Sequence, residues 1–201
     1  MLAAVVAALV VIAVVGVLRQ PEPAGLEIVP LDSEFAAFDH NPAAAAALID
    51  AWARWRTATV VTSGTWTRQL DAAEAPLTGT VYLAQDPPNR VSIRLSAEVS
   101  RIEDQERFDR LNANELVLVG GYVTGESRIY NVEFGDPGCF VAQLNIWAPA
   151  SPWGLRAEYC FDDASGALVS ARVRRQSATD IEVITDIRTT VTGEDFGPVE
   201  E

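Results

Sequence analysis

Hydrophobic residues follow different patterns in successive parts of this chain, and each pattern predicts a different structure. Residues 1–18 carry no charged side chain. Over residues 41–58, apolar positions recur at the spacing of an amphipathic helix. Beyond residue 59, apolar and polar positions alternate in most segments, as they do in half-buried strands. The chain is therefore predicted to contain an apolar segment, one helix and a β-rich region.

The first segment has the length of a membrane-spanning helix. As a helix, residues 1–18 would extend about 27 Å, close to the roughly 30 Å of a bilayer core. Pro21 and Pro23 separate it from the rest of the chain, which disfavours a buried core helix. A cleaved secretory signal is the alternative, but a positively charged start and an Ala-x-Ala site are missing. We predict a signal-anchor helix over 1–19 and a proline-rich tether over 20–38.

The helix after the tether has clear start signals. Asn41 is a preferred N-cap residue, and Pro42 is favoured at the first helical position. The helix is expected to end near Ala58. Its apolar face consists of Leu48, Ile49, Trp52 and Trp55.

About nine strands in meander order are predicted after the helix. Their ranges are 59–70, 77–85, 90–99, 115–123, 127–134, 139–147, 154–161, 167–175 and 181–191. Residues 98–112 are charged, and their pattern fits either a strand extension or a short helix. In the strand over 90–99, Val91, Ile93 and Leu95 are expected to face the core, and Arg90 and Ser92 the solvent. The fold class is α+β, with one amphipathic helix on a large antiparallel sheet spanning 39–197.

The two cysteines are predicted to form a disulfide. Cys139 and Cys160 lie at symmetric positions about the turn at residues 149 and 150, so they would be direct cross-strand neighbours. The Cα atoms of such neighbours lie about 4.5–5.5 Å apart, which is within the Cα–Cα range of disulfides. Disulfides persist in oxidising compartments, which favours a single-pass membrane protein with an extracytoplasmic domain. Two free thiols in a cytosolic domain are the alternative.

Composition excludes several kinds of function. The formal charge is −13, with 28 acidic residues against 15 basic ones, which argues against nucleic-acid binding. One His and two Cys cannot supply four His/Cys ligands to a zinc ion. His40 lies before the helix cap without an accompanying serine-nucleophile motif. No metal site, cofactor or catalytic residue is predicted, and a non-enzymatic role is favoured.

Residues 63–95 resemble a known family in their order of features. An aromatic-bearing strand with Trp66 is followed by a strand with Gly79, a turn at Pro87-Pro88 with Arg90, and another strand. This order is similar to the lipoprotein-localisation-factor (LolA/LolB-like) superfamily. That superfamily includes mycobacterial glycolipid-binding lipoproteins and RseB-type regulators of envelope signalling.

The resemblance implies a half-barrel whose concave face holds an apolar ligand, such as a lipid or a lipidated molecule. Residues that would line such a cavity are Trp52, Trp55, Trp66, Tyr82, Val91, Ile93 and Leu95. The same residues would equally suit an ordinary core beneath a closed sheet. A regulatory module that binds an envelope protein is the alternative function, and an enzyme of unknown class is a further one.

Thiol labelling tests the disulfide prediction. Protein denatured without a reductant should not be labelled by a thiol reagent, because the two sulfur atoms are bonded to each other. After reduction, two thiols per chain should be labelled. Labelling of two thiols before reduction would contradict both the disulfide and the expected export.

Overall fold

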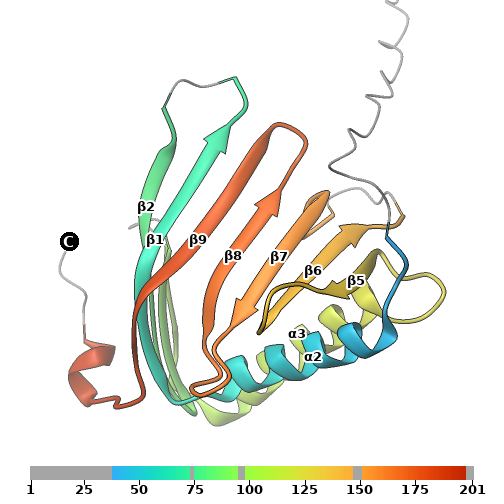
Figure 1. Cartoon of the computed structure of the whole chain (residues 1–201). Coiled ribbons are helices and arrows are strands. Elements are labelled where there is room, and N and C mark those ends of the chain that lie inside the picture. Colours follow the sequence, from blue (N-terminus) through green and yellow to red (C-terminus); the bar gives the residue numbers. More distant parts are fainter. Residues whose placement is uncertain (1–37, 73–74, 95–97, 147–150, 198–201) are drawn as a thin grey trace, which may run out of the picture. The chain divides into compact units, whose positions relative to one another are not determined.

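The computed structural model describes residues 38–72, 75–94, 98–146 and 151–197 of the chain (Figure 1). The predicted anchor over 1–19, and the predicted tether except for its last residue, lie outside the described residues. Within the described part, none of the helices combines the length and the hydropathy that crossing a bilayer requires.

The described strands form one large antiparallel sheet. They are β1 (Val60–Leu70), β2 (Leu77–Asp86), β3 (Asn89–Arg94), β4 (Glu98–Ile102), β5 (Tyr130–Phe134), β6 (Cys139–Leu144), β7 (Arg156–Phe161), β8 (Leu168–Arg174) and β9 (Ala178–Arg188). Their order is β4-β3-β2-β1-β9-β8-β7-β6-β5. The last strand, β9, pairs with both β1 and β8, so it joins two meanders into one curved sheet (Figure 1).

The first helix agrees with its sequence signals. Helix α2 (Pro42–Thr57) begins after Asn41, whose side-chain oxygen accepts hydrogen bonds from the backbone N–H groups of Ala43 (3.0 Å) and Ala44 (3.2 Å). These bonds satisfy donors that have no partner inside the helix. Leu48 and Trp52 are buried against the sheet, and Ile49 and Trp55 pack beside them.

The prediction of a strand over 115–123 is wrong. These residues belong to a second helix, α3 (Gln105–Val123), so two helices rather than one accompany the sheet. The valines and the Gly120-Gly121 pair favoured a strand locally, but tertiary burial follows helical spacing: Phe108, Asn112, Val119 and Val123 are buried. Asp104 caps the helix by accepting a hydrogen bond from the N–H of Arg107 (2.8 Å). The expected number of strands still agrees, because β4 takes the place of the lost one.

The two helices pack most closely against the half of the sheet that contains β5–β8. A single aromatic cluster fills the space between α2, α3 and strands β5–β8. Trp52 stacks on Trp153 with ring centroids 5.7 Å apart, and it also meets Tyr159 and Phe161 edge to face. Aromatic pairs of this kind contribute beyond the area that they bury. The interface between helix and sheet is therefore packed in this half.

A buried polar cluster joins the other half of the sheet to the helices. The amide nitrogen of Gln85 donates to the carbonyl oxygens of Trp55 (3.1 Å) and Ala58 (2.7 Å) at the end of α2. Arg90 donates from Nε to Gln85 (2.6 Å) and from one terminal nitrogen to the carbonyl of Arg56 (2.7 Å) and to Asn112 (2.8 Å). Strands β2 and β3 thereby cap the C-terminal end of α2.

The prediction for the strand over 90–99 is confirmed for its described apolar residues and wrong for Arg90. Val91 is 1% exposed and Ile93 is 9% exposed, as expected for core residues. Arg90, expected in solvent, is 7% exposed and donates a hydrogen bond to the carbonyl of Arg56 at the end of α2. Polarity misled the assignment of Arg90 because buried carbonyls of α2 need donors.

We expect Gln85→Met to destabilise the domain by about 3 kcal/mol. The substitution keeps the volume but leaves two carbonyls and the Nε of Arg90 without a hydrogen-bond partner in a buried place. Urea unfolding would measure the loss. Gln69→Met, at an exposed position of β1, is the matched control and should change stability by less than about 0.5 kcal/mol. Equal effects of the two substitutions would contradict this role of Gln85.

Candidate functional site

A cavity of about 230 Å³ lies between the end of α2 and the sheet. Its walls come from α2 and from strands β1, β2, β3, β8 and β9. Most of the lining is apolar or aromatic: Trp55, Val81, Tyr82, Leu83, Ile93, Leu168 and Ile184. The remaining lining residues are Arg56, Thr62, Ser92 and Glu182. An apolar cavity with a few polar groups at its wall is the usual form of a small-molecule binding site.

Arg56 brings a positive charge to the cavity wall. Its guanidinium lies 3.7 Å from the centroid of the Trp55 ring and forms an ion pair with Glu115 of α3. Glu115 also accepts a hydrogen bond from the indole nitrogen of Trp52 (3.0 Å). The Nε atom of Arg56 is buried and has no hydrogen-bond partner among the described residues. The charge of Arg56 is therefore balanced by that of Glu115, and one N–H group of the guanidinium remains without an acceptor in the described part of the chain.

The structure distributes the predicted cavity residues among several places. Trp55, Tyr82 and Ile93 line the cavity. Trp52 belongs to the packed aromatic cluster, and Trp66 is buried with the guanidinium of Arg68 5.3 Å from its ring centroid. Val91 is buried outside the cavity lining. Leu95 lies outside the described residues.

Sequence reasoning missed several lining residues. Val81 and Leu83 alternate in β2, and this pattern could have indicated them in addition to Tyr82. Leu168, Glu182 and Ile184 had no such signal. They reach the cavity only because β9 inserts between β1 and β8, which is a long-range pairing.

Asp180 is a buried carboxylate that the sequence did not single out. It is 5% exposed and accepts hydrogen bonds from Arg68 (2.5 and 2.9 Å) and from Arg175 (2.8 Å). Burial alone would raise the pKa of Asp180, but the hydrogen bonds and charges of the two arginines outweigh it and lower the pKa. The group therefore ties β1 to β9 and to the β8–β9 turn as an ionised carboxylate.

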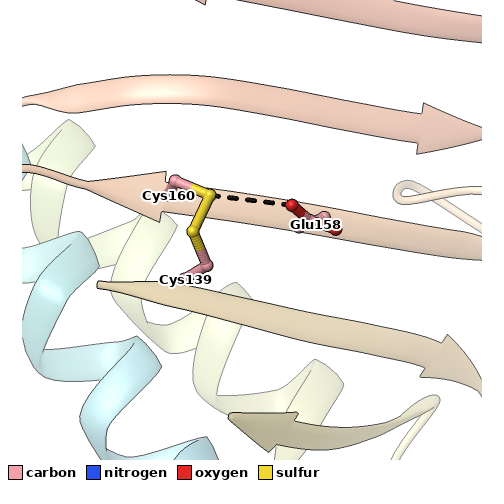
Figure 2. A group of neighbouring side chains, drawn as sticks. All are labelled: Cys139, Glu158 and Cys160. Carbon is pink, nitrogen blue, oxygen red and sulfur yellow. Dashed lines mark hydrogen bonds between the residues drawn. A yellow bond between two sulfur atoms is a disulfide. The ribbon is translucent and has the colours of Figure 1, made fainter. Parts of the chain in front are cut away.

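The predicted disulfide between Cys139 and Cys160 is present (Figure 2). The two residues are direct partners across β6 and β7, as the symmetric hairpin required. Glu158 lies beside them, with one oxygen 3.8 Å from the sulfur of Cys160. These three residues form a group with metal-ligating atoms, but both sulfur atoms are occupied by the bond between them. With both sulfur atoms in the disulfide, the carboxylate of Glu158 is the one group of the three that could ligate a metal ion.

A second cleft, of about 430 Å³, lies between α2 and the β5–β6 hairpin. Asp50, Asp136 and Asp163 contribute carboxylates, and Arg54 is the only basic residue in its lining. Phe134 supplies an exposed aromatic side chain. An open, acidic rim suits an apolar chain less well than the smaller cavity does.

The lone histidine has a structural position. The Nδ1 atom of His40 accepts a hydrogen bond from the N–H of Val132 on β5 (3.3 Å). Burial, together with the nearby charge of Arg128, lowers the pKa of His40, so the ring is neutral at pH 7. It helps to hold the start of α2 on the edge of the sheet.

Comparison with known proteins gives likenesses of fold only. No family model matches the chain, and no curated protein matches it. Lipoprotein LppX of Mycobacterium tuberculosis is a similar solved structure, with 14% identity, 76% of this chain and 98% of that chain covered, and a TM-score of 0.39. LprF of Mycobacterium bovis has 10% identity and a TM-score of 0.37, with 77% of this chain and 97% of that chain covered. A DUF1329 family protein of Desulfovibrio piger has 10% identity and a TM-score of 0.31, with 80% of this chain and 98% of that chain covered.

LppX is a mycobacterial lipoprotein, a kind of protein named in the resemblance stated from the sequence. With identities of 10–14% and TM-scores of 0.31–0.39, these likenesses carry no argument about function, which has to be argued from this chain's own residues.

We expect Asp180→Asn to lower stability at pH 7 by about 2 kcal/mol, because it removes charge-assisted hydrogen bonds that are partly screened by solvent. The pKa of Asp180 in the folded protein is lower than its ordinary value of 3.8. Its stabilisation is therefore complete above that ordinary value and disappears as the pH falls through the lower folded value. Urea unfolding of both proteins at pH 7 and about pH 3 should show the difference shrinking.

Asp71→Asn provides the matched control for this experiment. Asp71 is exposed and pairs with Arg174, so its removal should change stability less than the removal of Asp180 does. A constant difference between wild type and Asp180→Asn at both pH values would contradict the assignment of an ionised, stabilising carboxylate.

Proposed function

We propose that the described domain binds the apolar chain of a lipid or lipidated molecule in the cavity beside α2. The observation that carries the proposal is the set of apolar side chains in the lining, contributed by α2 and by five strands of the sheet. A chain of matching width would gain packing contacts with the apolar side chains of the lining. Burial of the ligand's methylene groups would supply the affinity.

The size of the cavity limits the ligand. At about 230 Å³, it is smaller than the 300–1,000 Å³ that is typical of sites for drug-sized molecules. The adjoining helix–sheet interface offers no further room, because aromatic side chains fill it. A single acyl chain, or the end of a longer one, is therefore a better fit than a diacyl lipid held entirely inside.

The polar part of the ligand is expected at the wall formed by Arg56. Its guanidinium supplies a positive charge in the lining, and Thr62 and Ser92 supply hydroxyl groups that can donate to an ester or carboxylate oxygen. Because Arg56 is already paired with Glu115, a strongly anionic head group would have to compete with that pair. An ester oxygen is the more favourable partner.

The proposal places the domain on the extracytoplasmic side of a membrane, tethered through residues 1–19. Two features support this location: the uncharged segment over 1–18 and the disulfide, which needs an oxidising compartment to persist. Binding of an apolar chain in the cavity does not depend on the location. Native mass spectrometry of protein purified from its own membranes would show whether a lipid or a partner protein accompanies it.

Binding of dansyl-undecanoic acid tests the cavity. We expect the full chain to enhance and blue-shift the probe's fluorescence, and Val81→Phe to weaken binding by about tenfold or more, because the larger ring fills the space. Val183→Phe is the matched control, since Val183 is 43% exposed and lies outside the cavity lining. It should bind the probe as the wild type does.

Overpacking can itself destabilise a protein by about 1–3 kcal/mol, so thermal unfolding must confirm that Val81→Phe is folded at the assay temperature. If the folded Val81→Phe variant binds the probe with unchanged affinity, the cavity is not the site. Co-purification of a protein without lipid would favour the alternative of a regulatory, protein-binding module.

A further inference from the structure

The outward face of α3 carries an unusual stripe of exposed apolar side chains. Val117 is 74% exposed, Leu118 is 54% exposed and Leu111 is 40% exposed. With the exposed residues Asn114 and Gly121, they occupy one side of the helix at helical spacing. The opposite side of α3 provides the buried Phe108, Asn112, Val119 and Val123. The helix is thus apolar on two faces, and only one of them is covered within the described residues.

The stripe is free of charge, although the chain as a whole is strongly acidic. Between residues 111 and 124 the only ionisable side chains are those of Glu115 and Tyr122. Glu115 points inward, where it pairs with Arg56 and Trp52. No exposed carboxylate or guanidinium therefore interrupts the stripe, and it requires a partner surface that is apolar rather than oppositely charged.

We propose that this stripe, defined by Leu111, Asn114, Val117, Leu118 and Gly121, inserts shallowly into the surface of a lipid bilayer. The inference extends the proposed function, because it concerns the surface from which the ligand would be obtained. It rests on the proposed membrane tether, and on the exposure and neutrality of α3.

The position at which the chain enters the domain supports this partner. The carbonyl of Phe38 accepts a hydrogen bond from Asn131, and Arg128, in the α3–β5 connection, donates to the same Asn131. The chain therefore joins the domain near the C-terminal end of α3. About 20 residues separate this point from the uncharged segment over 1–18, a reach of at most roughly 70 Å. A bilayer that holds the segment would always be within reach of the stripe.

The extent of the stripe also favours a bilayer over a protein. From residue 111 to residue 121 a helix advances about 15 Å, and with a width of about 10 Å this side of it covers about 150 Å², much less than the roughly 800 Å² per partner of a stable protein interface. A bilayer needs only a few inserted side chains when a tether already supplies a high effective concentration.

Docking through α3 would bring the cavity close to the lipid. Arg56 lines the cavity and pairs with Glu115 in the middle of α3, and Asn112 on the same helix binds Arg90 of β3. The wall of the cavity and the stripe are thus two sides of one helix layer. A chain leaving the bilayer would have a short distance to travel.

Site-directed fluorescence on the full chain tests this inference. Both native cysteines are in the disulfide, so Leu118→Cys offers a single reactive thiol for an NBD label. Arg172→Cys, at an exposed position of β8, is the control. In phosphatidylcholine vesicles, we expect the label at 118 to shift to shorter wavelength and to be quenched several-fold by brominated lipid, while the label at 172 changes little.

Two further measurements test whether the stripe contacts a bilayer or a second copy of the chain. Adding Val117→Glu to Leu118→Cys should abolish the shift and the quenching, because a carboxylate is costly to bury in lipid. Nanodiscs that hold one protein copy should preserve both signals. Equal quenching at 118 and 172, insensitivity to Val117→Glu, or loss of the signals in single-copy nanodiscs would overturn the proposal, the last by indicating a second copy of the chain.

The outcome is separable from that of the cavity. Val117→Glu should leave binding of dansyl-undecanoic acid in detergent solution unchanged, while Val81→Phe should leave the quenching at position 118 unchanged. Failure of one proposal would therefore not be mistaken for failure of the other.

Discussion

The final carbonyl groups of a helix have no partners within it, and those of α2 end beneath the sheet, away from water. Gln85, Arg90 and Asn112, from β2, β3 and α3, supply their hydrogen bonds. This contact joins the helices to β2 and β3, which contribute no residue to the aromatic cluster. Burial, reinforced by the charge of Arg56 and opposed by that of Glu115, lowers the pKa of Arg90 to about 10, so the side chain is still charged at pH 7. A buried charge of this kind persists because its hydrogen bonds to Gln85, to the carbonyl of Arg56 and to Asn112 replace those lost to water.

The same contact determines where space remains. Because α2 stops at Thr57 and is held there, the aromatic cluster fills the region over β5–β8, and the cavity lies just beyond the helix end. Arg56 belongs to both regions, since it lines the cavity and pairs with Glu115 of α3. Changes in the polar cluster would therefore alter the shape of the cavity as well as stability. The outward stripe of α3 completes an arrangement in which one helix layer separates the cavity from the proposed lipid surface.

Local signals were sufficient for much of the fold. The N-cap at Asn41, the apolar face of α2, the disulfide partners and most strands follow from spacing and residue type, because each depends on neighbours close in sequence. Local signals failed for α3, whose valines and glycines favour a strand until tertiary packing selects helical burial. They also failed for Arg90, which polarity assigned to solvent.

The amino-acid sequence by itself determined an α+β domain, its first helix and its disulfide, together with an acidic surface that disfavours nucleic acid. Only the tertiary structure decided which strand face meets the helices, where β9 inserts and which residues enclose the cavity. The physical reason is that burial of polar groups depends on partners distant in the chain. An arginine can be buried where the fold places acceptors such as the carbonyls of α2 within hydrogen-bonding distance, and is otherwise exposed to solvent.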